Sequence, residues 1–189
     1  MSHHATEDIA AMRMLPNMIV YAPFDPYDAE LAIADALDNS SPCYIRLEKN
    51  NEHIYSEIAD RNVNSITKFK DGLDIAVISY GSIVSEALKA HYANSAIGVY
   101  SITKLKPIDK SKILALLEKY KTIITLEEHN LIGGLYSIVS EISSSNGCKC
   151  KIVPLSFNDK YTSIVGDRDY LRKVYKLDAE YILSECEGI

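Results

Sequence analysis

The sequence has 189 residues, of which 47% are hydrophobic and 24% are charged, and its formal net charge is -6. This composition is that of a globular protein with enough apolar side chains for a core, and it excludes a largely disordered chain. The acidic balance argues against a nucleic-acid partner, because such a surface needs clustered Lys and Arg. No run approaches the roughly 20 apolar residues of a membrane span, and no signal sequence opens the chain. We therefore expect a cytoplasmic protein without a membrane or nucleic-acid partner.

The first 49 residues carry a set of elements that looks incomplete. We expect helices over 6–15 and 25–37 and strands over 18–22 and 43–47. Asp25 followed by Pro26 is a typical helix start. Two strands cannot cover both faces of a sheet or pair both of its edges. This part should therefore be completed by a preceding chain segment or by another polypeptide.

From Asp74 onward, apolar runs alternate with segments of helical periodicity, which is typical of βαβ units and a largely parallel sheet. Helices are expected between the strands, with Ser82 and Asp109 as capping residues, and two short helices follow in the tail. Pro154 lacks a backbone N–H, so the last strand should lie near a sheet edge. KLKP (104–107) is expected only to turn the chain. The expected strands cover residues 74–81, 96–102, 121–130 and 148–157.

The sequence therefore predicts an α/β fold in two unequal parts. Residues 1–51 form an incomplete α/β domain. Residues 52–72 form a surface connector, because this stretch is polar, rich in Asn and poor in periodicity. Residues 73–189 form a three-layer α/β domain with a mostly parallel sheet of about four to five strands.

The segment TLEEHNLIGG (125–134) lies where the third strand of this domain should end. Loops at the carboxyl ends of parallel strands often bind ligands, which makes Glu127, Glu128 and His129 candidates for chemistry. The glycines at 133 and 134 could leave the N-terminal N–H groups of the next helix open to an anion. The pattern matches neither a metal site nor a phosphate-binding fingerprint. We therefore favour a role in loop packing or in a subunit interface for these residues.

The four cysteines predict free thiols in a reducing compartment, because the chain has no secretory signal and no CxxC pair. Cys148 and Cys150 could share one face of a strand and hold a soft metal ion. Zinc, however, takes about four ligands, and no matching Cys or His pair lies near them in the sequence. No metal site is therefore predicted.

Two stretches of the N-terminal part could contact a substrate. His3 and His4 precede the first helix, where a histidine could bind a substrate hydroxyl or move a proton, although an exposed histidine near a chain start is common. Arg46 and Lys49 follow the second strand, where cations could hold a phosphate or a carboxylate. An ordinary ion pair with Glu48 at a solvated strand end is an equally good interpretation of that charge pattern.

Several motifs in order along the chain resemble a known family. SHHATEDIAAMRMLPNMIVYAPFDPYDAELAI (2–33) resembles the late part of the pyrimidine-binding domain of transketolase-like, thiamine-diphosphate-dependent enzymes. DIAVISYGSIVSEAL (74–88), SITKLKPID (101–109) and TLEEHNLIGGLYSIVSEI (125–142) are similar to successive units of the family's C-terminal domain. The resemblance covers essentially the whole chain. Transketolase itself, in the forms split into two subunits, is the best match.

The resemblance implies roles for particular residues. His3 stands at the family's catalytic, substrate-facing histidine position, near the bond that is cleaved. Lys49 falls where the family often has an arginine that binds the substrate phosphate, but a lysine lacks the bidentate fork of an arginine. Arg46 stays a substrate-binding candidate from its position after the second strand. The glutamate that activates thiamine and the GDG…N motif that holds magnesium have no counterpart here. Thiamine diphosphate and magnesium are therefore expected in the complete enzyme and not on this chain alone.

The implied activity is transfer of a two-carbon ketol unit between sugar phosphates in carbohydrate metabolism, with this chain as an inactive part of a larger assembly. Expected partners are the remaining transketolase domains or an N-terminal subunit, together with further copies of the chain, because active sites of the family form across a dimer. Alternatives are a fragment of 1-deoxyxylulose-5-phosphate synthase, an oxoacid dehydrogenase beta subunit, or a non-catalytic scaffold or interaction subunit. A free-standing dinucleotide-binding module ranks below these, because SYGSIVSEA (79–87) has a single glycine.

Overall fold

The computed structural model describes residues 6–48, 53–56, 58, 61–161 and 164–188. Its helices are α1 (Asp8–Met14), α2 (Pro26–Leu37), α3 (Val84–Ala93), α4 (Lys110–Lys119), α5 (Leu135–Asn146), α6 (Arg168–Val174) and α7 (Ala179–Glu187), with a 3-10 turn η1 (Gly81–Ile83). Its strands are β1 (Ile19–Tyr21), β2 (Cys43–Ile45), β3 (Ile66–Lys70), β4 (Ile75–Ser79), β5 (Ile97–Ile102), β6 (Lys104–Lys106), β7 (Thr122–Asn130) and β8 (Lys151–Phe157). None of these helices is long and apolar enough to cross a membrane.

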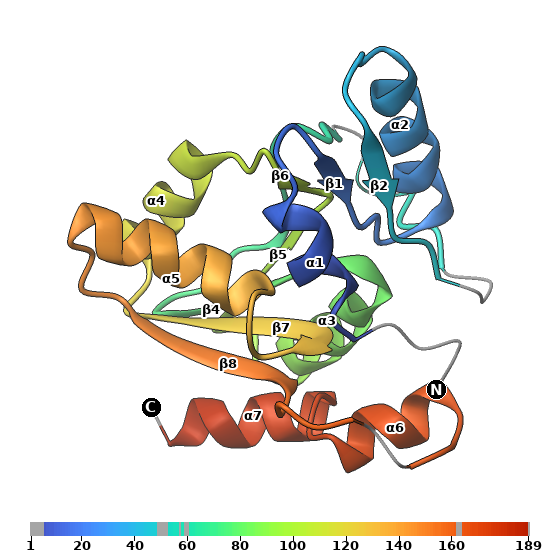
Figure 1. Cartoon of the computed structure of the whole chain (residues 1–189). Coiled ribbons are helices and arrows are strands. Elements are labelled where there is room, and N and C mark those ends of the chain that lie inside the picture. The colour runs from blue at the N-terminus through green and yellow to red at the C-terminus, as the bar shows by residue number, and fades with distance from the viewer. Residues whose placement is uncertain (1–5, 49–52, 57, 59–60, 162–163, 189) are drawn as a thin grey trace.

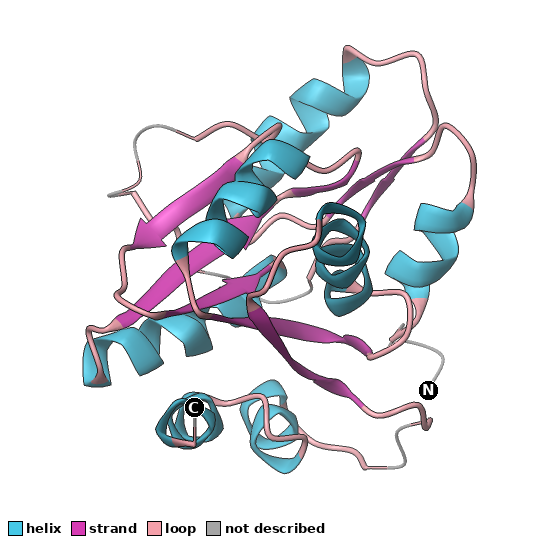
Figure 2. Ribbon diagram, turned by 90° about the vertical axis from the view of Figure 1, so that its left-hand side faces the viewer, coloured by secondary structure: helices cyan, strands magenta, loops and turns pink. Residues whose placement is uncertain are grey.

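The larger sheet has five strands in the order β3-β5-β4-β7-β8. Strands β5, β4, β7 and β8 are parallel, and β3 is antiparallel to β5. Helices α4 and α5 cover one face, while α3, α6 and α7 lie on the other (Figures 1 and 2). This arrangement confirms the predicted α/β fold with a three-layer domain, and it places β8 at an edge of the sheet.

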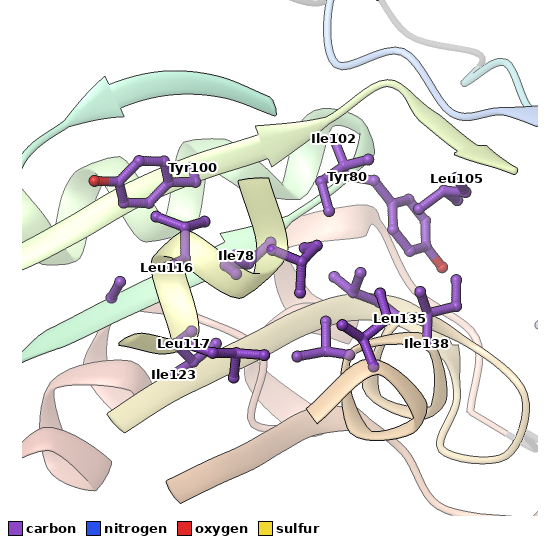
Figure 3. Close-up of a cluster of buried hydrophobic side chains, with 14 of the residues drawn as sticks. Ile78, Tyr80, Tyr100, Ile102, Leu105, Leu116, Leu117, Ile123, Leu135 and Ile138 are labelled. Carbon is purple, nitrogen blue, oxygen red and sulfur yellow. The ribbon is translucent and has the colours of Figure 1, made fainter. Parts of the chain in front are cut away.

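The alternation of side chains along each strand divides the apolar core between the two faces. In β4, Ala76 and Ile78 point toward α4 and α5, whereas Val77 points toward α3. In β7, Ile123 and Ile124 divide in the same way. Figure 3 shows the first of these two cores, which lies beneath α4 and α5. Because both faces of these strands are buried, their sequences are continuous hydrophobic runs.

A second, three-stranded sheet has the order β2-β1-β6, in which β2 is parallel and β6 antiparallel to β1. The KLKP segment was expected only to turn the chain, and this expectation is wrong because residues 104–106 form a strand. One edge of the N-terminal sheet is thus paired by a strand of the C-terminal part. Within the described residues, β2 pairs only with β1.

The segment predicted as a connector, 52–72, contains an element that its polarity concealed. Residues 66–70 form β3, which pairs with β5 at an edge of the larger sheet. Tyr55 and Val63 are buried, and the ring of Tyr55 stacks edge-on against Phe69. The connector prediction is therefore wrong for this strand, because an edge strand can carry lysines on its exposed positions and still complete a sheet.

Aspartates begin four of the helices. The carboxylates of the residues at 25, 109, 167 and 178 each accept the backbone N–H three positions later, which satisfies an otherwise unpaired helical donor. The predictions for Asp25 and Asp109 are confirmed. Ser82 was also expected to cap a helix, but it lies in η1 and its hydroxyl binds Glu48 and Arg172 instead.

Candidate functional site at the carboxyl end of β7

The buried carboxylate of Glu127, near the carboxyl end of β7, binds the N-terminus of α5. It accepts the backbone N–H groups of Leu135 at 2.7 Å and Tyr136 at 3.0 Å. Gly134, the residue before the helix, has no side chain that could do so. The sequence suggested that this helix end was open to an anion. In the structure the carboxyl group of Glu127 itself occupies that place.

Burial determines the protonation of Glu127. Loss of hydration raises the pKa of Glu127 to about 7, although the two helical N–H groups and the hydroxyl of Tyr80, at 3.2 Å, favour the charged form. Burial and the neighbouring Glu127 also raise the pKa of Tyr80 well above 10. Glu127 therefore titrates near neutral pH inside the protein.

Glu128 links β7 to α6. Its two carboxylate oxygens accept hydrogen bonds from Nε and Nη2 of Arg172 at 2.8 and 3.2 Å, which is a bidentate arrangement. Nη2 of Arg172 also donates to the hydroxyl of Ser82 in η1 at 3.0 Å. The guanidinium is almost completely buried, so this pair holds the tail of the chain against the sheet.

His129 and Asn130 bind the N-terminal part of the chain. Nδ1 of His129 donates to the carbonyl oxygen of Asn130 at 2.7 Å, which leaves Nε2 unprotonated to accept the backbone N–H of Ala10 in α1 at 3.2 Å. Burial lowers the pKa of His129 below its ordinary value of 6.5, in agreement with this neutral tautomer. The backbone N–H of Asn130 donates to the carbonyl of Thr6 at 2.6 Å.

Arg46 connects the end of β2 to the same strand end. Its Nη2 donates to the carbonyl oxygen of Glu128 at 2.9 Å, and Nη1 lies 3.4 Å from the hydroxyl of Tyr80 and 3.6 Å from Asp8 of α1. Asp8 in turn accepts the hydroxyl of Tyr44 at 2.7 Å. A continuous set of polar contacts thus runs from α1 and β2 to β7.

Glu48, two residues after Arg46, is bound by η1. One carboxylate oxygen of Glu48 accepts the backbone N–H of Ser82 at 2.9 Å, and the other accepts the Ser82 hydroxyl. Gly81, at φ +69°, adopts the left-handed conformation that brings this N–H to the carboxylate. The N-terminal part is therefore bound at two places by loops at the carboxyl edge of the larger sheet.

The structure places the predicted site residues unevenly. His3, His4 and Lys49 lie outside the described residues. Arg46 is described, and the contacts above are with groups of the protein itself, so its predicted substrate role stays a prediction. Among the residues that the structure describes, no three His, Cys, Asp or Glu side chains are placed to hold a metal ion. Cys148 and Cys150 are both free thiols.

The loop-packing role favoured for Glu127, Glu128 and His129 is confirmed within the chain, since each contacts a different element. Sequence reasoning missed two of their partners, Tyr80 and Arg172, and it also missed Asp8, which pairs with Arg46. Asp8 and Arg172 are buried charges on helices, and nothing in the helical pattern distinguishes them from exposed ones. The tyrosine at the end of a strand expected to be buried was a usable signal, because a buried phenol usually finds a hydrogen-bond partner.

Replacing Gly134 with alanine is expected to lower the free energy of unfolding by about 2 kcal/mol, because overpacking a dense core typically costs 1–3 kcal/mol. The added Cβ would overlap the Glu127 carboxylate and would lie 2.8 Å from Nδ1 of His129. Urea unfolding followed by circular dichroism measures the change. Gly188→Ala is the matched control, since its Cβ would meet only ordinary contacts. An equal effect of the two substitutions would contradict the close packing at Gly134.

Family models agree with the order of the two parts. The model described as the transketolase C-terminal domain matches residues 66–182, and the model of the transketolase pyrimidine-binding domain matches residues 1–53. The first match alone covers more than half of the chain. The chain belongs to the transketolase family.

Relatives of this transketolase-family chain include separate subunits. A protein of Methanocaldococcus jannaschii described as a transketolase C-terminal section is 35% identical over 96% of this chain and 58% of its own length. A 6-deoxy-6-sulfo-D-fructose transketolase subunit of a Clostridium species is 30% identical over 100% of the chain and 59% of its length. A 1-deoxy-D-xylulose-5-phosphate synthase of Dictyoglomus turgidum is 28% identical over 100% of the chain and 32% of its length.

Solved structures agree with this assignment. A split-gene transketolase, described as an inactive beta4 tetramer, superposes with a TM-score of 0.89 at 29% identity over 99% of this chain and 62% of that one. The transketolase of Campylobacter jejuni has a TM-score of 0.72 at 15% identity, a likeness of fold alone. The transketolase-family chain spans less than two thirds of the length of these relatives.

Proposed function

We propose that this chain acts as the C-terminal section of a transketolase-type enzyme that transfers a two-carbon ketol unit between sugar phosphates. The observation that supports this most is the pair of family matches in their family order, together with relatives that are themselves separate transketolase subunits. Because the chain spans only part of its relatives, activity would need the remaining domains, and the chain alone would be inactive.

We propose further that the complete enzyme uses thiamine diphosphate with magnesium. Bound in the complete enzyme, the cofactor would supply an electron sink for the carbanion that forms when the ketol bond breaks. The described residues do not fit this group, because they offer no metal-binding cluster and the N-terminus of α5 is already occupied by Glu127. The cofactor site would therefore belong to the remaining domains.

On the substrate side, we propose His3 as the residue that contacts oxygens near the reacting bond and Lys49 as the cation that holds the phosphate. Arg46 would support this role indirectly. Its contacts with the Glu128 carbonyl and with Asp8 hold the chain just after β2, three residues before Lys49 in the sequence. A lysine offers a point charge and no bidentate fork, so phosphate binding would tolerate several orientations of the substrate.

The exposed apolar side chains of the N-terminal part support assembly with further domains or copies of the chain. Met14 and Leu37 are each 81% exposed, and Leu47 is 60% exposed. Within the described residues β2 also has one unpaired edge. Edges and apolar side chains of this kind are usually covered in the working protein. We propose that the remaining transketolase domains cover them.

A reconstitution experiment tests the proposal. The chain is combined with a polypeptide that carries the missing domains, thiamine diphosphate and magnesium, and ketol transfer between sugar phosphates is measured. Activity is expected only in the mixture. His3→Ala should lower kcat/KM by about 100-fold, the usual scale for a group that contacts reacting atoms, whereas the control His4→Ala should behave as the parent. Full activity of His3→Ala would remove the assignment of His3.

The synthase relatives support a second candidate, a section of a 1-deoxyxylulose-5-phosphate synthase, because they too match the full chain. The same mixture, assayed with the substrates of that synthase, separates the two functions. Turnover of those substrates without ketol transfer between sugar phosphates would favour the synthase.

A further inference from the structure

We propose that the carboxyl end of β7 positions the substrate-contacting segments of the N-terminal part, with His129 as a positioning residue for His3. This inference rests on the proposed function, and it gives the C-terminal part an influence on the chemistry that acts through His3. The positioned segments are residues 6–10, which follow His3, and residues 46–48, which precede Lys49.

The first segment is held by hydrogen bonds to its backbone. Asn130 donates its N–H to the carbonyl of Thr6, and Nε2 of His129 accepts the N–H of Ala10. The first bond lies just before α1 and the second lies in its first turn, and the N-cap residue Glu7 makes no side-chain cap. A helix whose early N–H groups lack other partners frays easily, so the contact with His129 stabilises the first turn of α1.

The tautomer of His129 makes this contact selective. Its Nδ1 is committed as a donor to the Asn130 carbonyl, so a neutral ring can accept at Nε2, and a protonated ring cannot. The absent Cβ of Gly134 leaves the space that the ring occupies. A buried imidazole held at both nitrogens has little freedom to move, which is what positioning requires.

The second segment is held from the same sheet edge. Arg46 binds the carbonyl of Glu128, the residue adjacent to His129, and Glu48 binds Ser82 in η1. Glu128 lies near the carboxyl end of β7, and η1 follows the carboxyl end of β4. Because β4 and β7 are neighbouring parallel strands, these two ends lie side by side. The two segments that lead to His3 and Lys49 are therefore fixed relative to each other by the C-terminal part.

The test uses three variants of the assembled enzyme. His129→Gln can place an amide oxygen near the position of Nε2, whereas His129→Asn reaches only as far as Nδ1 and removes the acceptor for Ala10. The control is His91→Asn on α3, because the amide of asparagine can replace the bond from Nδ1 of His91 to the Ile97 carbonyl. Hydrogen exchange of a peptide covering 6–14 and steady-state kinetics are measured for each.

We expect exchange of this peptide to be at least about 10-fold faster in His129→Asn and close to the parent in His129→Gln and His91→Asn. In ketol transfer, His129→Asn should lower kcat about 10-fold with little change in KM. This loss should disappear in a His3→Ala background, because a residue that acts through His3 has no effect once His3 is absent.

Unchanged exchange in His129→Asn would overturn the proposal, and so would a loss of kcat that adds fully to that of His3→Ala. If the assembled parent shows no ketol transfer, the proposed function fails. In that case the exchange data still decide whether His129 holds α1.

Discussion

Replacing Arg172 with methionine is expected to lower the free energy of unfolding by about 3–5 kcal/mol, the usual cost of removing one partner of a buried ion pair. The guanidinium binds Glu128 and lies 3.9 Å from the carboxylate of Glu86. Without it, the Glu128 carboxylate loses its cation beside the sheet, whereas the carboxylate of Glu86 keeps Lys89 at 2.7 Å. Equilibrium unfolding in urea, with the midpoint and the slope both recorded, measures the loss.

Lys173→Met is the matched control, because it makes the same kind of change one residue away on α6. Lys173 is largely exposed and lies 3.6 Å from Glu180, also exposed, so its loss should cost less than about 0.5 kcal/mol. The double variant Arg172→Met with Glu128→Met should recover part of the loss, since an apolar pair can replace a buried ion pair. Equal effects of Arg172→Met and Lys173→Met would contradict the buried linkage between β7 and α6.

The larger sheet could be predicted because its strands are apolar on both faces and its helices have one apolar stripe. Segments such as 74–81 and 121–130 therefore have a single good interpretation. Strands β3 and β6 were missed because both are short and carry lysines, and only their partners in the fold make them strands. Pairing of this kind is a tertiary property that a local pattern does not contain.

For a similar reason, the sequence predicted the residues of the candidate site but not their partners. The position of Glu127–His129 at the end of a strand followed from the alternating pattern, and their packing role followed from the absence of a ligand signature. Their partners Ala10 and Arg172 are distant in sequence and approach only through the topology. The occupied N-terminus of α5 could not be foreseen, because a glycine before a helix is compatible with a bound anion and with a carboxylate of the chain.

Glu127 is expected to make the protein less stable as the pH rises from 5 to 8. Burial raises its pKa to about 7 in the folded protein, whereas 4.5 is its ordinary value. Between these values the folded protein binds a proton that the unfolded chain has released, so stability is greatest below the unfolded pKa and falls as the pH passes through the folded pKa. The expected loss from this group is about 2–3 kcal/mol.

Other groups also titrate in this range, so the comparison must be made against Glu127→Gln. Burial raises the pKa of Asp28 to about 6, which acts in the same direction, and the lowered pKa of His129 acts in the opposite one. These contributions are common to both proteins and cancel in the difference. Glutamine also places an NH2 group near one helical N–H, which lowers stability by a similar amount at every pH.

The difference in unfolding free energy between the parent and Glu127→Gln should therefore shift by about 2–3 kcal/mol against the parent between pH 5 and pH 8. Glu118→Gln, at an exposed position on α4, should give a curve parallel to that of the parent. Urea unfolding at intervals of half a pH unit measures both. A parent that gains stability relative to Glu127→Gln as the pH rises would mean that the helical N–H groups outweigh burial. Glu127 would then be a permanently charged cap of α5 and not a group that titrates near neutral pH.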